Sequence, residues 1–224
     1  MARLASFHLV RHHRVIDAMT HLATARRLLR RVPGLAFSRV LGTGRGADTG
    51  PSADLRRTGL FAIWEAESDL DQFLAAPPQA WAQVAERYDV RLRGIGGHGT
   101  WRGVAVLAGL ERGAHGGPIA VVTRADVRPA AWRRFRAAGP AVSSELEGAP
   151  GLLAVAGVGE LPVGRLGTFS LWSGIDAVSA FARSPRHAEV VRRTRAERWY
   201  GEELFARFEP FGASGTWDGR DPLG

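Results

Sequence analysis

The sequence predicts an α+β protein built from two copies of one βαββαβ unit. Its 224 residues are enough for one large domain or for two of about 112 residues each. A Gly-Thr-Trp-x-Gly motif occurs twice, at Trp101 and at Trp217, so its two copies lie about half a chain apart. Self-similarity at a fixed spacing is the mark of a repeated structural unit. We therefore expect an internal duplication.

Other matching segments occur in the same order in the two halves. GLFAIW at 59–64 aligns with GTFSLW at 167–172, and Pro-Gly-Leu occurs upstream of each. Gly and His cluster between the halves, as is typical of linkers. The sequence thus predicts a first repeat at residues 1–111, a linker at 112–117 and a second repeat at 118–224.

In the first repeat, the spacing of apolar residues places the elements. Apolar residues recur at helical intervals from Val15 to Leu29, and Pro33 ends the helix. From Tyr88 to Leu92, apolar residues alternate with charged ones, as in a strand with one buried face. The expected elements are a strand at 5–10, a helix at 15–31, a strand at 35–41, a flexible loop at 42–54, a strand at 58–65, a helix capped by Ser68, a helical segment after Pro77 and a last strand around 88–92.

The second repeat follows the same order. Ser184 followed by Pro185 is a specific start signal for a helix, with serine as the N-cap and proline at the first helical position. The expected elements are a strand at 119–123, a helix at 129–146, strands at 152–158 and 167–172, a helix at 175–182, a long helix from Ser184 and a last strand. Two such ferredoxin-like units can pack into a pseudo-dimer that resembles a dimeric α+β barrel.

Composition excludes several classes of chemistry. The chain has no cysteine, and all 30 of its basic residues are arginine, so thiolate ligands, thiol nucleophiles and lysine Schiff bases are excluded. The net charge of +8 comes without a nucleic-acid-binding module, so no nucleic-acid partner is expected. We see no signal-peptide core or membrane span and expect a cytoplasmic protein, whose basic charge permits peripheral contact with an anionic membrane.

Seven histidines carry most of the available metal or acid–base chemistry. We expect His12, His13 and His115 to face solvent in loops, and His21 to lie on a helix of mixed polarity. The roles of His8 and His98 stay open, and no catalytic residue is assigned.

His187 differs from the other histidines because it opens a helical stripe. Val191, Thr194 and Arg198 follow it at helical spacing, so an imidazole is followed by small or apolar groups and then by a cation. Such a face suits a flat cofactor with anionic ends, such as haem, whose iron takes an imidazole nitrogen and whose propionates take arginine. The alternative is an ordinary histidine at the surface of a first helical turn.

An arginine run surrounds this stripe, at 192, 193, 195 and 198. Glutamates nearby can pair with most of these charges on a solvated helix face. We expect two arginines to point outward and one or two, Arg195 and Arg198, to face the ligand. Trp199 is expected to belong to the core.

The string SPRHAEVVRRTRAERWYGEELFARF at 184–208 resembles the C-terminal signature of the spheroidene monooxygenase family. A weaker similarity includes HLVR near the start, the Pro-Gly-Leu segments and both Gly-Thr-Trp motifs. The resemblance implies a duplicated dimeric α+β barrel and a haem-dependent oxygenase that inserts a keto group into an acyclic carotenoid. It also implies that His187 is the axial ligand of the iron of haem b.

These observations predict a monooxygenase that acts on an apolar small molecule, with O₂ and electrons from an external donor. We expect an apolar pocket lined by the barrel, with His187 pointing into it and Val191, Thr194, Arg195 and Arg198 lining the cofactor. The alternatives are a cofactor-free monooxygenase of the same architecture, a non-enzymatic carrier of haem or another hydrophobic ligand, and a basic protein associated with nucleic acid. The protein is expected to be a monomer or a homodimer.

Overall fold

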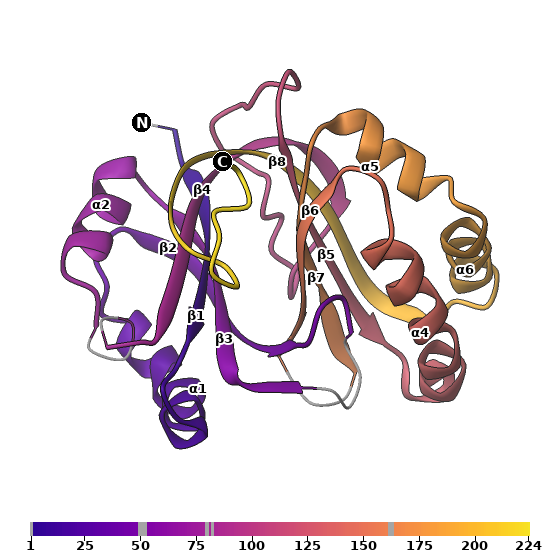
Figure 1. Ribbon diagram of the computed structural model, residues 1–224, viewed down its shortest axis with the longest axis horizontal. Helices are drawn as coiled ribbons and strands as arrows, with labels where there is room; N and C mark the ends of the chain where they lie inside the picture. Colours follow the sequence, from indigo (N-terminus) through magenta and orange to yellow (C-terminus); the bar gives the residue numbers. More distant parts are fainter. Residues whose placement is uncertain (1, 49–52, 79–80, 82, 161–163) are drawn as a thin grey trace.

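The protein is a closed eight-stranded antiparallel barrel with helices on its outside, in a computed structural model that describes residues 2–48, 53–78, 81, 83–160 and 164–224 (Figure 1). The described elements are, in order, β1 (Leu4–Arg11), α1 (Val15–Leu29), β2 (Leu35–Gly44), β3 (Ala53–Trp64), α2 (Glu67–Ala75), β4 (Glu86–Gly99), β5 (Ile119–Val127), the 3-10 turn η1 (Pro129–Ala131), α4 (Trp132–Glu147), β6 (Leu152–Gly159), β7 (Arg165–Trp172), α5 (Ile175–Ala182), α6 (Pro185–Ala196) and β8 (Tyr200–Gly215).

The barrel closes in the strand order β1-β3-β2-β6-β7-β5-β8-β4. Each half of the chain contributes four neighbouring strands, and the halves meet where β2 pairs with β6 and where β4 pairs with β8. Helices α1 and α2 lie outside one side of the barrel, and α4, α5 and α6 lie outside the other (Figure 1). A mixed α/β fold is therefore confirmed. Of the described helices, none is both long and apolar enough to cross a membrane.

Some expected elements differ from the observed ones. The loop expected at 42–54 is wrong at its ends, because Thr43 pairs with Asp54 and Gly44 with Ala53 as β2 and β3 continue into a long hairpin. Ser68 does not cap α2, which begins at Glu67 after Ala66. The helical segment expected after Pro77 includes residues 79, 80 and 82, which lie outside the described residues.

Aromatic side chains fill the barrel interior. Phe7 on β1 and Phe169 on β7 come from strands that are not neighbours, yet their rings stack with centroids 3.8 Å apart. Phe61, Trp101 and Trp217 belong to the same buried cluster. An eight-stranded barrel is just wide enough for its own side chains to fill. The expectation of a cofactor pocket inside the barrel is therefore wrong, because packed rings occupy that space.

The two Gly-Thr-Trp-x-Gly motifs form the same turn at the barrel ends. Trp101 and Trp217 are both buried in the barrel core. Residues 102 and 218, which follow them, both have a positive φ, of 52° and 54°. A glutamate from the facing strand closes each turn: Glu202 accepts hydrogen bonds from Thr100 Oγ1 and the Gly103 amide, and Glu86 accepts them from Thr216 Oγ1 and the Gly219 amide. The repeated motif thus has one structural role, which is to bring a tryptophan into the barrel core.

Candidate functional site

His187 lies in the first turn of α6, outside the barrel, where α6 packs against α4 and α5 (Figure 1). It is half-buried. Ser184 is the residue before the helix and Pro185 is its first residue, as the sequence predicts. The helix that carries His187 is therefore where it was expected, but its surroundings are other helices and not the barrel interior.

Glu145 of α4 holds the start of α6 in place. One of its carboxylate oxygens, Oε2, accepts hydrogen bonds from Ser184 Oγ (2.8 Å) and from the backbone amide of His187 (2.9 Å). Desolvation opposes ionisation, but these hydrogen bonds and the charge of Arg186 outweigh it and lower the pKa of Glu145. The Ser184 hydroxyl thus donates a hydrogen bond to the Glu145 carboxylate, and this carboxylate caps α6.

This arrangement predicts that α6 loosens in acid. A lowered pKa in the folded state means that the stabilisation from Glu145 is complete above its ordinary pKa of 4.5 and is lost as the pH falls through the lower folded value. In Glu145→Gln, we expect hydrogen exchange at the His187 amide to be several-fold faster at neutral pH than in the native chain, and to lose this pH dependence. Equal protection of that amide in both proteins at neutral pH would refute the role of Glu145.

The His187 ring is oriented by its own neighbours. Its Nδ1 lies 3.2 Å from the carbonyl oxygen of Ala182, at the end of α5, so Nδ1 carries the proton and donates it to this acceptor. The ring packs on Phe181, with centroids 4.6 Å apart. Among the residues that the structure describes, Nε2 has no hydrogen-bond partner. Metal-bound histidines commonly donate one ring N–H to a backbone carbonyl in this way and bind the metal through the other nitrogen.

The other residues of the predicted stripe divide into two groups. Val191 is half-buried and Thr194 is buried, so both lie with His187 on the inward face of α6. Arg195 and Arg198 are exposed and form no ion pair within the described part of the chain. Arg198 does not continue the helical face, because α6 ends at Ala196 and Arg198 has a φ of 51°.

The neighbouring arginines confirm the expected solvated face. Arg192 pairs with Glu189, and Arg193 pairs with Glu197 at 3.4 Å. Trp199 is fully buried, as expected, and its indole nitrogen donates to Glu197. Arg195 and Arg198 are thus the arginines of this run that keep their charge available for an anionic ligand.

Helix α4 covers the second half of the sheet loosely. It buries only Leu146, whereas α1 buries Ala18, His21, Ala25 and Leu29 against the first half. Apolar side chains of β6 beneath α4, such as Leu152 and Val155, are only partly buried. A helix normally covers the apolar face that it packs on. The second half therefore keeps apolar surface next to α4, on the side of the barrel where His187 lies (Figure 1).

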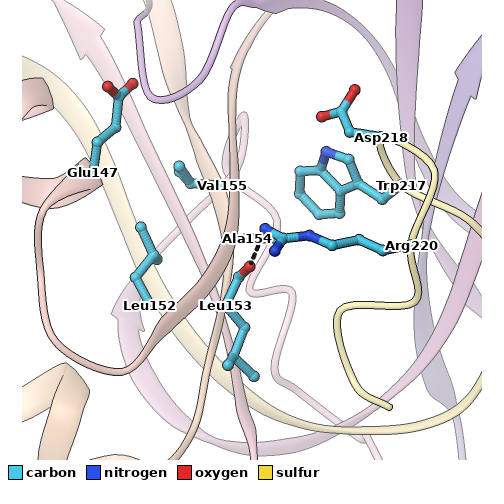
Figure 2. Close-up of a pocket in the computed structure, with 8 residues that line it drawn as sticks. All are labelled: Glu147, Leu152, Leu153, Ala154, Val155, Trp217, Asp218 and Arg220. Atoms are coloured by element: carbon cyan, nitrogen blue, oxygen red, sulfur yellow. Dashed lines mark hydrogen bonds between the residues drawn. The ribbon is translucent and has the colours of Figure 1, made fainter.

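A small cavity lies at one edge of this region. Its volume is about 250 Å³, and Figure 2 shows the indole of Trp217 and the guanidinium of Arg220 facing β6 across it, with Arg220 donating to the Leu153 carbonyl. The lining residues are Glu147, Leu152, Leu153, Ala154, Val155, Trp217, Asp218 and Arg220. This volume is below the range of typical ligand sites. No residue of the predicted stripe lines it, so the cavity and the His187 region are distinct.

Sequence reasoning missed a buried polar layer between the first half of the sheet and its helices. His8 Nδ1 donates to Asp89 Oδ1 (2.6 Å), and His8 Nε2 lies 2.7 Å from Ser6 Oγ. Trp64 Nε1 also donates to Ser6 Oγ. Desolvation would raise the pKa of Asp89, but the hydrogen bonds and charges of His8 and Arg87 outweigh it and lower the pKa. Ser6, His8 and Asp89 are all buried. This chain of contacts therefore orders the core and offers no access to a substrate.

The expected exposure of His12 is wrong, because His12 and His21 are both buried and touch each other. His12 Nε2 lies 3.0 Å from His21 Nδ1 and 3.1 Å from Thr58 Oγ1. His21 also packs edge-on against Trp81, with centroids 4.1 Å apart. Burial lowers the pKa of His21 from 6.5 to about 3, with a smaller contribution from His12.

Among the described residues, no cluster of three or more His, Asp or Glu side chains could hold a metal ion without a cofactor. His13 and His115 are exposed, as expected.

The buried imidazole of His21 predicts a loss of stability in mild acid. The unfolded chain binds a proton at this residue below pH 6.5 and the folded chain does so only near pH 3, so the free energy of unfolding falls between these values. The slope is about 1.4 kcal/mol per pH unit for one proton. Urea unfolding across this range checks it: the slope should be smaller in His21→Leu and unchanged in the exposed control His115→Gln. Identical slopes in all three proteins would contradict the prediction.

Comparison with solved structures shows the fold. A crystal structure of the aldoxime dehydratase OxdRE in complex with butyraldoxime aligns with 94% of this chain and 80% of its own, with a TM-score of 0.60 at 12% identity. A second aldoxime dehydratase structure covers 93% of this chain and 82% of its own, with a TM-score of 0.56 at 10% identity. At these identities the likeness extends to the architecture alone.

Comparison with curated proteins shows the family. Spheroidene monooxygenase of Rhodobacter capsulatus is 30% identical over 211 residues, which cover 92% of this chain and 88% of that protein. The protein of the same name from Rubrivivax gelatinosus is 35% identical and covers 84% of this chain and 73% of its own. The chain spans 61% of the length of the Cereibacter sphaeroides relative, at 33% identity. No protein-family model matches the chain. With this identity over most of its length, the chain belongs to the spheroidene monooxygenase family of oxidoreductases.

Proposed function

We propose that the protein is a haem-dependent monooxygenase that acts on an apolar substrate, an acyclic carotenoid or a related compound, into which it inserts a keto group. Membership of the family supports the monooxygenase reaction, and the name shared by the three relatives supports a spheroidene-like substrate. The observation that carries the proposal is the His187 ring, held with its Nδ1 proton on the Ala182 carbonyl and its Nε2 without a partner among the described residues.

The residues around His187 fit haem b. A single neutral imidazole from the protein would be enough to hold the iron of a haem, and His187 would provide it. Phe181 and Val191 provide apolar contacts beside the imidazole, and the loosely covered sheet beneath α4 provides further apolar surface. Arg195 and Arg198 supply free guanidinium groups for two propionates. We therefore assign His187 as the iron ligand and Val191, Thr194, Arg195 and Arg198 as residues of the cofactor site.

Each of these side chains has a defined task in this proposal. Bound haem would supply the activation of O₂ that amino-acid side chains cannot perform. The Ala182 carbonyl keeps the proton on Nδ1, which fixes the tautomer and makes Nε2 the donor to the metal. Glu145 sets the angle at which α6 presents the ring, and Phe181 keeps water from one face of it. Electrons come from an external donor, because the sequence carries no flavin or nicotinamide motif.

Reconstitution with haem distinguishes this proposal from its alternatives. We expect the purified protein to take up one haem per chain, with a Soret band, and to oxygenate an acyclic carotenoid when O₂ and a reductant are supplied. Product without haem would favour a cofactor-free monooxygenase. Haem with both axial positions filled by protein and no product would favour a carrier.

We also propose that the chain arose by internal duplication, with ferredoxin-like repeats at 1–111 and 118–224 joined by a linker at 112–117. The same order of strands in each half and the two matching Trp101 and Trp217 turns support this division. In this proposal only the second repeat keeps the cofactor site, because His187 has no histidine at the matching position of the first repeat, which is Gln79. The fused protein would act in the cytoplasm as a monomer or a homodimer.

A further inference from the structure

Helix α1 presents apolar side chains to solvent at its first turns. Ile16 is 61% exposed, Met19 is 50% exposed and Val15 is 41% exposed. Ile16 and Met19 lie on the side of α1 away from the buried Ala18 and His21. The core-facing positions of α1 are already buried. The exposed apolar side chains are therefore not needed for packing against the core.

The start of β3, which includes the exposed Leu55, runs near this apolar surface. Leu55 is 57% exposed and lies next to Arg56, whose carbonyl accepts a hydrogen bond from the His12 amide (2.7 Å) and whose Nε donates to the His12 carbonyl (3.2 Å). His12 is three residues before α1, so the start of β3 runs beside the start of α1. We call Val15, Ile16 and Met19 the α1 patch.

Arginines surround the α1 patch. Residues 12–31 contain five exposed arginines against one acidic residue, Asp17, which is paired with Arg14 at 2.8 Å. These twenty residues thus carry half of the net charge of +8. Arg26 and Arg30 follow Met19 at spacings of seven and four residues, so one exposed face of α1 is apolar in its first half and cationic in its second. Arg56 adds a further exposed cation beside Leu55.

We propose that the α1 patch and its arginines dock the protein on an anionic lipid bilayer. Apolar side chains rimmed by arginine match the boundary between acyl chains and negatively charged headgroups. A second copy of this chain is the less suitable occupant, because a symmetric dimer through this face would bring the same uncompensated arginines of both copies together. The inference rests on α1 and not on the cofactor site, so it stands or falls independently of the proposed reaction. Figure 1 shows α1 and α6 on opposite sides of the barrel.

Vesicle sedimentation tests this proposal with the full chain. We expect the protein to bind vesicles of phosphatidylcholine mixed with phosphatidylglycerol and not vesicles of phosphatidylcholine alone, with binding that weakens as salt is added. The double variant Ile16→Ser/Met19→Ser should bind about tenfold more weakly, because it loses two inserting side chains. Val104→Ser, which changes an exposed apolar residue elsewhere, should bind as the native chain does.

A matched pair of arginine variants distinguishes the effect of where a positive charge lies from the effect of the net charge of the protein. Arg26→Gln should reduce binding several-fold, whereas Arg133→Gln, which removes one exposed charge from α4, should not. Circular dichroism confirms that each variant is folded. The proposal is overturned if the native chain does not bind anionic vesicles, or if a variant of the α1 region and its matched control bind equally well. It is also overturned if the native chain binds no vesicles but forms a concentration-dependent dimer that Ile16→Ser/Met19→Ser abolishes.

Discussion

Replacing His187 with alanine is expected to weaken haem binding by about a hundredfold or more and to abolish oxygenation. The substitution removes an imidazole nitrogen that has no partner among the described residues, and no other histidine lies on α6. Without this imidazole, haem would be held only by apolar contacts and by arginines at its propionates. Titration of the purified chain with haem, followed at the Soret band, measures the loss.

His98→Ala is the matched control for this substitution. The exposed His98 side chain also packs on a phenylalanine, Phe205, as the half-buried His187 packs on Phe181. We expect His98→Ala to bind haem as the native chain does. The assignment of His187 fails if the two alanine variants lose the same amount of haem, or if His187→Ala retains the Soret band and the affinity of the native chain.

Replacing Phe169 with alanine is expected to lower the free energy of unfolding by about 3–5 kcal/mol. Phe169 is fully buried in the barrel, stacks on Phe7 at 3.8 Å and lies 6.1 Å from the ring of Trp217. The smaller side chain leaves a cavity that the rigid surrounding strands cannot close, and the lost aromatic contacts add to the cost. Chemical unfolding followed by circular dichroism gives the difference.

The size of this effect tests whether the barrel interior is a core or a ligand site. Leu55→Ala, at an exposed position, should change stability by less than about 0.5 kcal/mol. An interior built to hold a substrate would tolerate Phe169→Ala with little loss and would gain ligand space. A change below about 1 kcal/mol would therefore argue against the packed interior.

The sequence predicted the alternation of strands and helices because periodicity and turn residues are local signals. Apolar alternation from Tyr88 to Leu92 located β4, and the Ser184–Pro185 signal located α6. It did not predict the long β2–β3 hairpin, because the pairs Thr43–Asp54 and Gly44–Ala53 lie in a polar, glycine-rich stretch that lacks alternation. Strand pairing there depends on the neighbouring strand and not on local composition.

The environment of the histidines could not be predicted from the sequence for a related reason. His12 and His21 become buried only when Thr58 and Trp81, which are distant in sequence, pack against them. Nothing in the local pattern distinguishes His12 from the exposed His13 next to it. Burial is a property of the folded whole, and a single sequence offers no observation of it.

The candidate site was predicted in part. The helical spacing correctly placed His187, Val191 and Thr194 on one face, because α6 is regular from Pro185 to Ala196. It extended that face too far, to Arg198, because spacing alone contains no stop signal. The chain leaves the helix there to bury Trp199, and Arg198 adopts a positive φ to make this turn. The role of Glu145 was missed, since a contact between α4 and α6 joins residues about forty positions apart.

The most direct test of the central claim is resonance Raman spectroscopy of the ferrous, haem-reconstituted protein. We expect an iron–histidine stretching band in the native chain, its loss in His187→Gly, and its return at a shifted frequency when free imidazole fills the space left by the ring. An iron–histidine band that persists unchanged in His187→Gly without imidazole would contradict the assignment of His187 as the axial ligand.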